Sequence, residues 1–393
     1  MTISLLHQCG HNNNWNRNSY VDEDVGDGLI LSPVHMAKNV VENLDEDIRA
    51  GSLFDPQFYL PSSQKRKLNT YDFFPENISG GFETDSFAMH ALESARLCVD
   101  FQLSQSFSGL IIPTRYFDQM ISDFTDMQNV YTVHPFVEAL SEVNYDTPVY
   151  LSLVLTSHMV KDEKFRTNIL NWVTSFQEID GIYLIPDCPR TTKQVDDADF
   201  IEEILVMLHQ LREIGLDVIL GYQNTEGLLM TLVPEVEITF GSFENTRIFS
   251  IDKFLETEEE RRGPRARIYL PGLFNWIQLG QAKEIRSNAP DIWERIHVPT
   301  DYSEEALDAA VEPYFNQPQL YMHHFITYEE QVRELEALDA ADRYEFLRTN
   351  IRTAQEIYSE LDRFRFDLEK YGRGDFLDSW LNAINRHWRN YLA

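Results

Sequence analysis

Cysteine is scarce in this sequence. Its three cysteines, Cys9, Cys98 and Cys188, lie far apart, and none belongs to a CxxC or Cys/His spacing of the kind that binds zinc. The spacing argues against a disulfide framework, and we expect reduced thiols, as in a cytoplasmic protein. We also expect no bound metal.

Long apolar runs are missing as well. None reaches the roughly 18 residues that a helix needs to cross a bilayer. Residues 1–30 have no basic start followed by an apolar stretch, so we expect no secretion signal. These observations predict a soluble protein that does not associate with membranes.

The chain has few positively charged residues relative to its negatively charged ones. The chain has 33 Lys and Arg against 64 Asp and Glu, which gives a net charge of -31. Its average field repels phosphate, so double-stranded nucleic acid is disfavoured as a partner. The densest basic stretch contains Arg261, Arg262, Arg265 and Arg267 and follows the acidic residues 256–260. We interpret it as a solvated loop, with a local basic patch as the alternative.

Familiar cofactor and nucleophile motifs are also missing. No Walker loop, GxGxxG, HExxH or GxSxG occurs in a fitting context. We therefore predict no cofactor, and no motif states the reaction.

Eight short apolar runs, spread over the first 245 residues, are the strongest positive signal. Helix-like stretches separate most of them, and buried strands that alternate with helices are typical of a (β/α)8 TIM-like barrel. Such barrels carry their chemistry at the carboxyl-terminal ends of the strands. The runs are residues 3–10, 28–33, 53–60, 109–115, 149–157, 181–187, 218–224 and 236–242.

The pattern divides the chain at about residue 250. Residues 1–250 are predicted to form the α/β barrel, with a long insertion at 61–107 after strand 3. Residues 251–393 are mixed and then helical, and we expect them to pack on the barrel and supply its final helix.

Local signals refine this picture. Helices are predicted at 34–50, 84–102 and 199–214, and Gly215 is a natural stop for the last. The Asn-rich segment 11–20 shows no helical period and is predicted to be irregular, either at the catalytic face or as a flexible surface loop.

Two carboxylates are candidate catalytic groups. Asp187 ends the sixth run, where it is placed to act as acid, base or nucleophile, and Glu244 follows the eighth. The alternative for Asp187 is a turn-capping role ahead of Pro189.

Other polar residues at the strand ends are candidate substrate ligands. An arginine grips carboxylate or phosphate with parallel hydrogen bonds, and glycines at the ends of strands 7 and 8 allow an anion to approach the backbone. Rim salt bridges and ordinary turns are the alternatives. The two histidines could share a face for metal binding, but hydrogen-bonded histidines are the interpretation we favour. The candidates are His7, His11, Arg115, Arg190, Tyr222, Gln223, Asn224, Ser242 and Arg247.

Three stretches resemble the tRNA-guanine transglycosylase family. They are Ser79-Gly-Gly-Phe82, the seventh strand with its helix at 221–229, and Tyr321-Met-His-His-Phe325 with the helical residues 342–352 that follow. The resemblance implies a barrel with a C-terminal region and chemistry on a nucleobase.

The sequence departs from that family at its functional positions. Ile78 stands where the family has an Asp before Ser-Gly-Gly-Phe, and Gly241 is nearest to the position of the nucleophilic Asp. The Cys-rich zinc site is missing. No catalytic role therefore transfers to a residue of this chain.

Two functional hypotheses follow. The first is an enzyme that acts on a nucleoside, nucleotide or related anionic small molecule by glycosyl-transfer or hydrolytic chemistry. The second is a non-catalytic subunit or scaffold that binds a protein partner, such as a nucleobase-modifying enzyme. An enzyme needs the strand-end groups to converge on an open pocket, whereas a scaffold tolerates a covered mouth.

Overall fold

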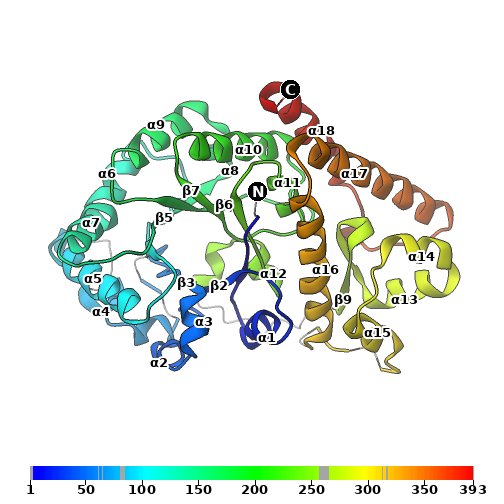
Figure 1. The fold of residues 1–393 in the computed structure, drawn as a ribbon, viewed down its shortest axis with the longest axis horizontal. Coiled ribbons are helices and arrows are strands. Elements are labelled where there is room, and N and C mark those ends of the chain that lie inside the picture. The colour runs from blue at the N-terminus through cyan, green and yellow to red at the C-terminus, as the bar shows by residue number, and fades with distance from the viewer. Residues whose placement is uncertain are drawn as a thin grey trace.

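Eight parallel strands form a barrel in the N-terminal part of the chain (Figure 1). The computed structural model describes residues 3–60, 62–63, 65–79, 85–255, 265–311, 313–315 and 317–392. The strands are β1 (Leu5–Gln8), β2 (Gly28–Leu31), β3 (Ser52–Phe54), β4 (Leu110–Ile112), β5 (Val149–Thr156), β6 (Gly181–Asp187), β7 (Asp217–Leu220) and β8 (Val236–Phe240).

The sheet curls so that β1 and β8, which are the first and last of its strands along the chain, lie side by side. Its order is β3-β2-β1-β8-β7-β6-β5-β4, and β1 pairs in parallel with both β2 and β8. Within the described residues no ladder of backbone hydrogen bonds joins β3 to β4. At the start of these strands the Ser108 N–H donates to the Ser52 carbonyl at 2.9 Å. The barrel is therefore nearly closed, which confirms the predicted (β/α)8 fold class.

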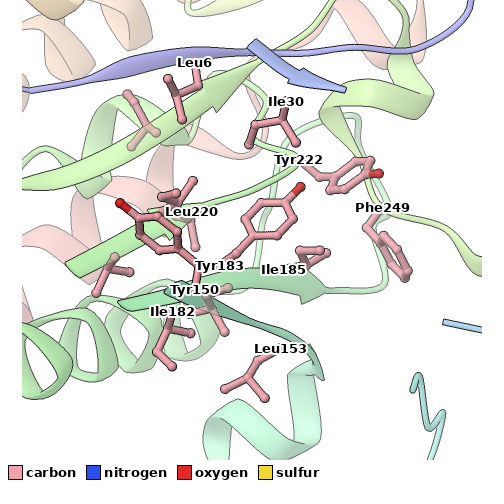
Figure 2. Packing of buried hydrophobic residues seen from close by; sticks show 14 of the residues in the cluster. Leu6, Ile30, Tyr150, Leu153, Ile182, Tyr183, Ile185, Leu220, Tyr222 and Phe249 are labelled. Atoms are coloured by element: carbon pink, nitrogen blue, oxygen red, sulfur yellow. The ribbon is translucent and has the colours of Figure 1, made fainter. Parts of the chain in front are cut away.

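Burial explains why the strands read as continuous apolar runs. Almost every strand residue is buried, because a barrel wall is covered by helices outside and side chains inside. The interior holds large rings such as Tyr183 and Tyr222 (Figure 2). The run at 181–187 coincides with β6. The runs at 53–60 and 218–224 continue beyond β3 and β7, because their last residues form the rim.

Helices surround the barrel. They are α1 (Asn14–Asp22), α2 (Lys38–Glu42), α3 (Glu46–Ala50), η1 (Leu68–Thr70), α4 (Pro75–Ser79), α5 (Asp85–Ser104), α6 (Phe124–Gln128), η2 (Asn129–Val133), α7 (His134–Ser141), α8 (Ser157–Lys161), α9 (Glu163–Val173), α10 (Ala198–Glu213), α11 (Gly227–Met230) and α12 (Glu244–Arg247).

Local signals set the ends of α10. The Asp197 side chain accepts a hydrogen bond from the Phe200 N–H at the start of the helix. Gly215 follows its end with φ +86°, a conformation that favours glycine. The predicted helix at 199–214 is thus confirmed, as is the one at 84–102, which corresponds to α5.

Two local predictions were wrong. The segment 11–20 is largely helical, because α1 buries Trp15 against Tyr321 with ring centroids 5.2 Å apart, and this packing overrides the weak propensity of its Asn residues. The predicted helix at 34–50 is two short helices, α2 and α3, separated by residues 43–45.

The remaining chain forms a β-hairpin and a helical layer. Its elements are η3 (Ile251–Phe254), β9 (Arg267–Leu270), η4 (Pro271–Leu273), β10 (Asn275–Gln278), α13 (Leu279–Asn288), α14 (Pro290–Ile296), α15 (Asp301–Asp308), α16 (Gln319–Glu336), α17 (Ala340–Arg363), η5 (Lys370–Gly372), α18 (Leu377–His387) and η6 (Trp388–Leu392). Within the described residues, no helix has the length and apolar character needed to span a membrane.

Helix α16 covers the junction of β1 and β8. The Phe325 ring lies 4.8 Å from the His7 ring and 5.3 Å from the Phe240 ring. Arg333 on the same helix donates to the Ile3 carbonyl at 2.9 Å. In Figure 1, α16 stands between the barrel and the layer of α13–α15. It occupies the place of the final barrel helix.

Phe325→Ala should destabilise the fold by about 3–5 kcal/mol, because it leaves a cavity at this junction. Urea unfolding followed by circular dichroism measures the loss. Phe364→Ala is the matched control, since Phe364 is 65% exposed and its loss should change stability by less than about 0.5 kcal/mol. Equal effects of the two substitutions would contradict this role for α16.

Candidate functional site

Polar side chains from several strand ends meet at the carboxyl-terminal mouth of the barrel. We call Asp55, Tyr59, Tyr116, Asp187, Tyr222 and Lys253 the mouth cluster. They follow β3, β4 and β7, end β6 or belong to η3. Convergence of titratable groups at this end of a barrel marks a candidate active site.

Asp55 lies at the buried centre of the cluster. The Tyr59 hydroxyl donates to Asp55 Oδ2 at 2.8 Å, and the Gln57 backbone N–H donates to Oδ1 at 3.1 Å. Burial raises the pKa of Asp55 from 3.8 to about 6, although these hydrogen bonds and the charge of Lys253 oppose the shift. The carboxyl is therefore tuned towards neutral pH.

Two neighbours of Asp55 have uncommon backbone conformations. Gln57 and Tyr222 have φ of 57° and 54°, in the left-handed region that non-glycine residues seldom adopt. The Gln57 amide nitrogen is 3.4 Å from both Asp55 Oδ2 and Tyr222 Oη, and its oxygen accepts from Ser32 Oγ at 3.0 Å. Strained backbone of this kind is frequent at functional sites.

Lys253 reaches into the mouth from η3. Its amino group donates to the Tyr222 hydroxyl and lies 3.7 Å from the centre of that ring, with the Phe254 and Phe249 rings 5.0 and 5.5 Å away. Burial lowers the pKa of Lys253, while the negative charge of Asp55 raises it. The aromatic faces also favour the ammonium form.

Asp187 is the second carboxyl group of the mouth cluster. The Tyr116 hydroxyl donates to Asp187 Oδ2 at 2.6 Å, and burial raises the pKa of Asp187. The Tyr116 backbone N–H donates to the Tyr59 carbonyl at 3.0 Å. Because each tyrosine holds one aspartate, this backbone bond ties the two carboxyl groups into a single network.

Phe249 occupies the middle of the mouth. Its ring lies 5.4 Å from the ring of Tyr222 (Figure 2), and 5.6 and 5.9 Å from the rings of Tyr59 and Tyr116. Phe254 packs on Tyr59 at 5.3 Å. Both phenylalanines are buried, and Asp55 has no exposed surface. Residues 249–254 therefore cover the carboxyl group of Asp55.

Of the residues predicted for the site, Asp187 and Tyr222 belong to the mouth cluster. His7 is on the outer side of β1, where its Nε2 donates to the Val25 carbonyl at 3.0 Å. Burial lowers the pKa of His7 to about 3. His11 is exposed, with its ring 6.1 Å from that of Phe243. Arg115 is partly exposed over the ring of Phe117, at 5.4 Å.

Four other candidates pair with nearby groups. Arg190 forms an ion pair with Glu226 at 2.6 Å, and Glu244 pairs with Lys193 at 2.5 Å. Asn224 Nδ2 donates to the Lys193 carbonyl at 3.1 Å. The Gln223 amide donates to the Gly221 carbonyl at 2.8 Å.

Ser242 and Arg247 are buried near the end of β8. Neither the Ser242 hydroxyl nor the Nε and Nη1 atoms of Arg247 have a hydrogen-bond partner.

Sequence reasoning missed Lys253, Tyr59 and Tyr116. Asp55, Gln57 and Tyr59 alternate directly after β3, a spacing that places them on one face, and this signal was available. No sequence pattern pointed to Lys253, because it belongs to a short turn outside the strands.

No group of three or more His, Cys, Asp or Glu side chains within the described ranges could hold a metal ion. No protein-family model matches the chain, and no curated protein matches its sequence.

The stretches that carry the transglycosylase resemblance have varied placements. In Ser79-Gly-Gly-Phe82, the last three residues lie outside the described residues. Tyr321–Phe325 belongs to α16 and is buried. There His323 Nε2 donates to the Tyr269 carbonyl at 2.9 Å, so this histidine stabilises the hairpin contact.

Asp55→Asn should change how stability depends on pH. Because the pKa of Asp55 is higher in the folded protein, folding favours its protonated form. The stability that this form contributes is complete below pH 3.8 and is lost as the pH rises to about 6. Relative to Asp55→Asn, the wild type should therefore lose on the order of 3 kcal/mol across that window.

Urea unfolding at several pH values measures this difference. Asp367→Asn is the control, since the Asp367 side chain is 98% exposed and its variant should follow the wild-type curve. Parallel curves for the wild type and Asp55→Asn would contradict the assignment.

Proposed function

We propose that this chain is an enzyme that cleaves or transfers the glycosidic bond of a nucleoside, nucleotide or related anionic small molecule. The observation that supports it is the pair of tyrosine-held carboxyl groups, Asp55 and Asp187, within one hydrogen-bonded network at the barrel mouth. Two carboxyl groups are the usual equipment for glycosidic-bond chemistry. The nucleobase in the substrate comes from the resemblance to transglycosylases.

The surroundings of the two carboxyl groups suggest different roles. Asp55 receives hydrogen bonds on both oxygens and lies near Lys253, and these contacts favour its carboxylate form. It is the proposed nucleophile, which attacks the anomeric carbon as the glycosidic bond breaks. Asp187 is partly exposed and receives one hydrogen bond, from the Tyr116 hydroxyl, and it is the proposed acid that protonates the departing base. Water or a second base then takes the sugar from Asp55.

Access to Asp55 requires movement of the covering segment. Phe249 and Phe254 fill the mouth above the carboxyl, so a substrate reaches it when these rings are displaced. When the two rings return to their place over the site, they also exclude water from the reacting groups.

The test is base release from a panel of nucleosides and nucleotides, followed by liquid chromatography. Asp55→Asn and Asp187→Asn should each slow release at least about 100-fold, because each removes one of the two carboxyl groups. The exposed Asp367→Asn should retain the wild-type rate. Thermal unfolding of each variant checks that it folds. Absence of release from the whole panel, or wild-type rates in both variants, would remove the proposal.

The second candidate function is a non-catalytic subunit. The covered mouth favours it, since a scaffold has no need of an open pocket. On this proposal the chain binds a protein partner, which native mass spectrometry of material purified at low salt would reveal as a stable complex. A monomer that releases base would count against it.

Both proposals place the protein in the cytoplasm, on the basis of its free, buried thiols. Neither involves duplex nucleic acid, because of the net charge of -31.

A further inference from the structure

A buried arginine without a compensating partner lies between the barrel and the hairpin. Arg247 ends α12, just after β8, and has 8% of its surface exposed. Two of its guanidinium nitrogens, Nε and Nη1, are buried without a hydrogen-bond partner. Buried charges in proteins are normally paired, so this arrangement demands an explanation.

Further unpaired polar groups lie close to the guanidinium. Arg247 stacks over the Trp276 ring at 4.0 Å, and the His324 ring is 4.6 Å from Trp276. The indole N–H of Trp276 and both ring nitrogens of His324 are buried without partners. Trp276 comes from β10 and His324 from α16, so three separate elements bring these groups together.

The nearest carboxylates are already engaged. Glu226 pairs with Arg190, and Glu244 pairs with Lys193. Burial lowers the pKa of Arg247 to about 10, against weaker opposing effects from Tyr321 and these two glutamates. The positive charge of Arg247 thus remains largely uncompensated, in a chain whose net charge is -31.

The neighbouring His324 does not compensate the positive charge of Arg247. Burial and the charge of Arg247 lower the pKa of His324 well below its ordinary value, so it is neutral at physiological pH and can donate one N–H. The indole N–H is a donor only. The partners that this cluster lacks include acceptors, and a negatively charged acceptor would also balance Arg247.

We propose that Arg247, Trp276 and His324 form a binding site for an oxyanion, either the phosphate or the carboxylate of a small molecule. The site lies between the end of β8 and the β9–β10 hairpin and does not use the residues of the mouth cluster. It therefore goes beyond the proposed glycosidic chemistry and stands or falls separately from it.

Thermal unfolding with added anions tests the site. Sodium phosphate and sodium citrate are titrated against sodium chloride at matched ionic strength, so that the two arms distinguish phosphate from carboxylate. A bound anion stabilises the folded state, and the midpoint temperature should rise in a saturable way by about 3 °C or more in at least one arm.

Arg247→Met should abolish this rise while leaving the anion-free protein at least as stable as the wild type. Methionine keeps much of the apolar volume over Trp276 and removes the uncompensated charge. Arg348→Met is the matched control, because Arg348 pairs with Glu345 on the surface and its variant should respond to anions like the wild type. Asp55→Asn should also keep the response, whatever its effect on base release.

Two outcomes would overturn the site: no rise beyond that in chloride, or a rise that persists in Arg247→Met. Should Arg247→Met fail to fold, Arg247→Lys replaces it. Lysine keeps the charge but loses the planar stack and its fixed donors, so the anion concentration at half-maximal effect should increase at least about tenfold. An unchanged concentration would equally overturn the proposal.

Discussion

The parallel pairing of β1 with β8 is the constraint on which the other features depend. It turns a sheet of eight strands into a barrel and brings the carboxyl-terminal ends of the strands to one rim. Without it, β3-β2-β1 and β8-β7-β6-β5-β4 would be two separate ladders, with Asp55 after one and Asp187 on the other. Helix α16 protects this junction, and it comes from a part of the chain some 80 residues beyond β8. The barrel and part of the C-terminal region therefore share one core, to which Phe325 and Trp380 both belong, while a second core lies within residues 266–368.

Among the described residues, the barrel mouth and the hairpin each contain desolvated charge. At the mouth, burial acts against the charged forms of both Asp55 and Lys253, and aromatic rings replace water around the amine. Beside the hairpin, Arg247 is deprived of a carboxylate. Each arrangement costs folding free energy that an apolar core would not. Such costs are characteristic of residues kept for binding or chemistry.

The fold class and most strands could be predicted from the sequence, because the buried strands of a parallel barrel consist of continuous apolar runs. The same property hides which residues point inward. Gln8 bonds to Tyr183 inside the barrel, so His7, one residue earlier, faces the helices outside. Asp187 and Tyr222 could be predicted because they sit directly at strand ends. Lys253 could not, since its position depends on how a short turn folds back over the mouth. The hairpin β9–β10 was also missed, because its short strands lie in a stretch of mixed composition.

The β3–β4 seam differs from the other strand contacts of the barrel. It is bonded near one end by Ser108 and Ser52 and near the other by Tyr116 and Tyr59. The Tyr116–Tyr59 bond joins the two tyrosines that hold Asp55 and Asp187. A parting of the wall along this line would therefore break that bond and separate Tyr59 from Tyr116. The joint of the barrel with the fewest backbone hydrogen bonds is thus also the one that links the residues holding the two acids.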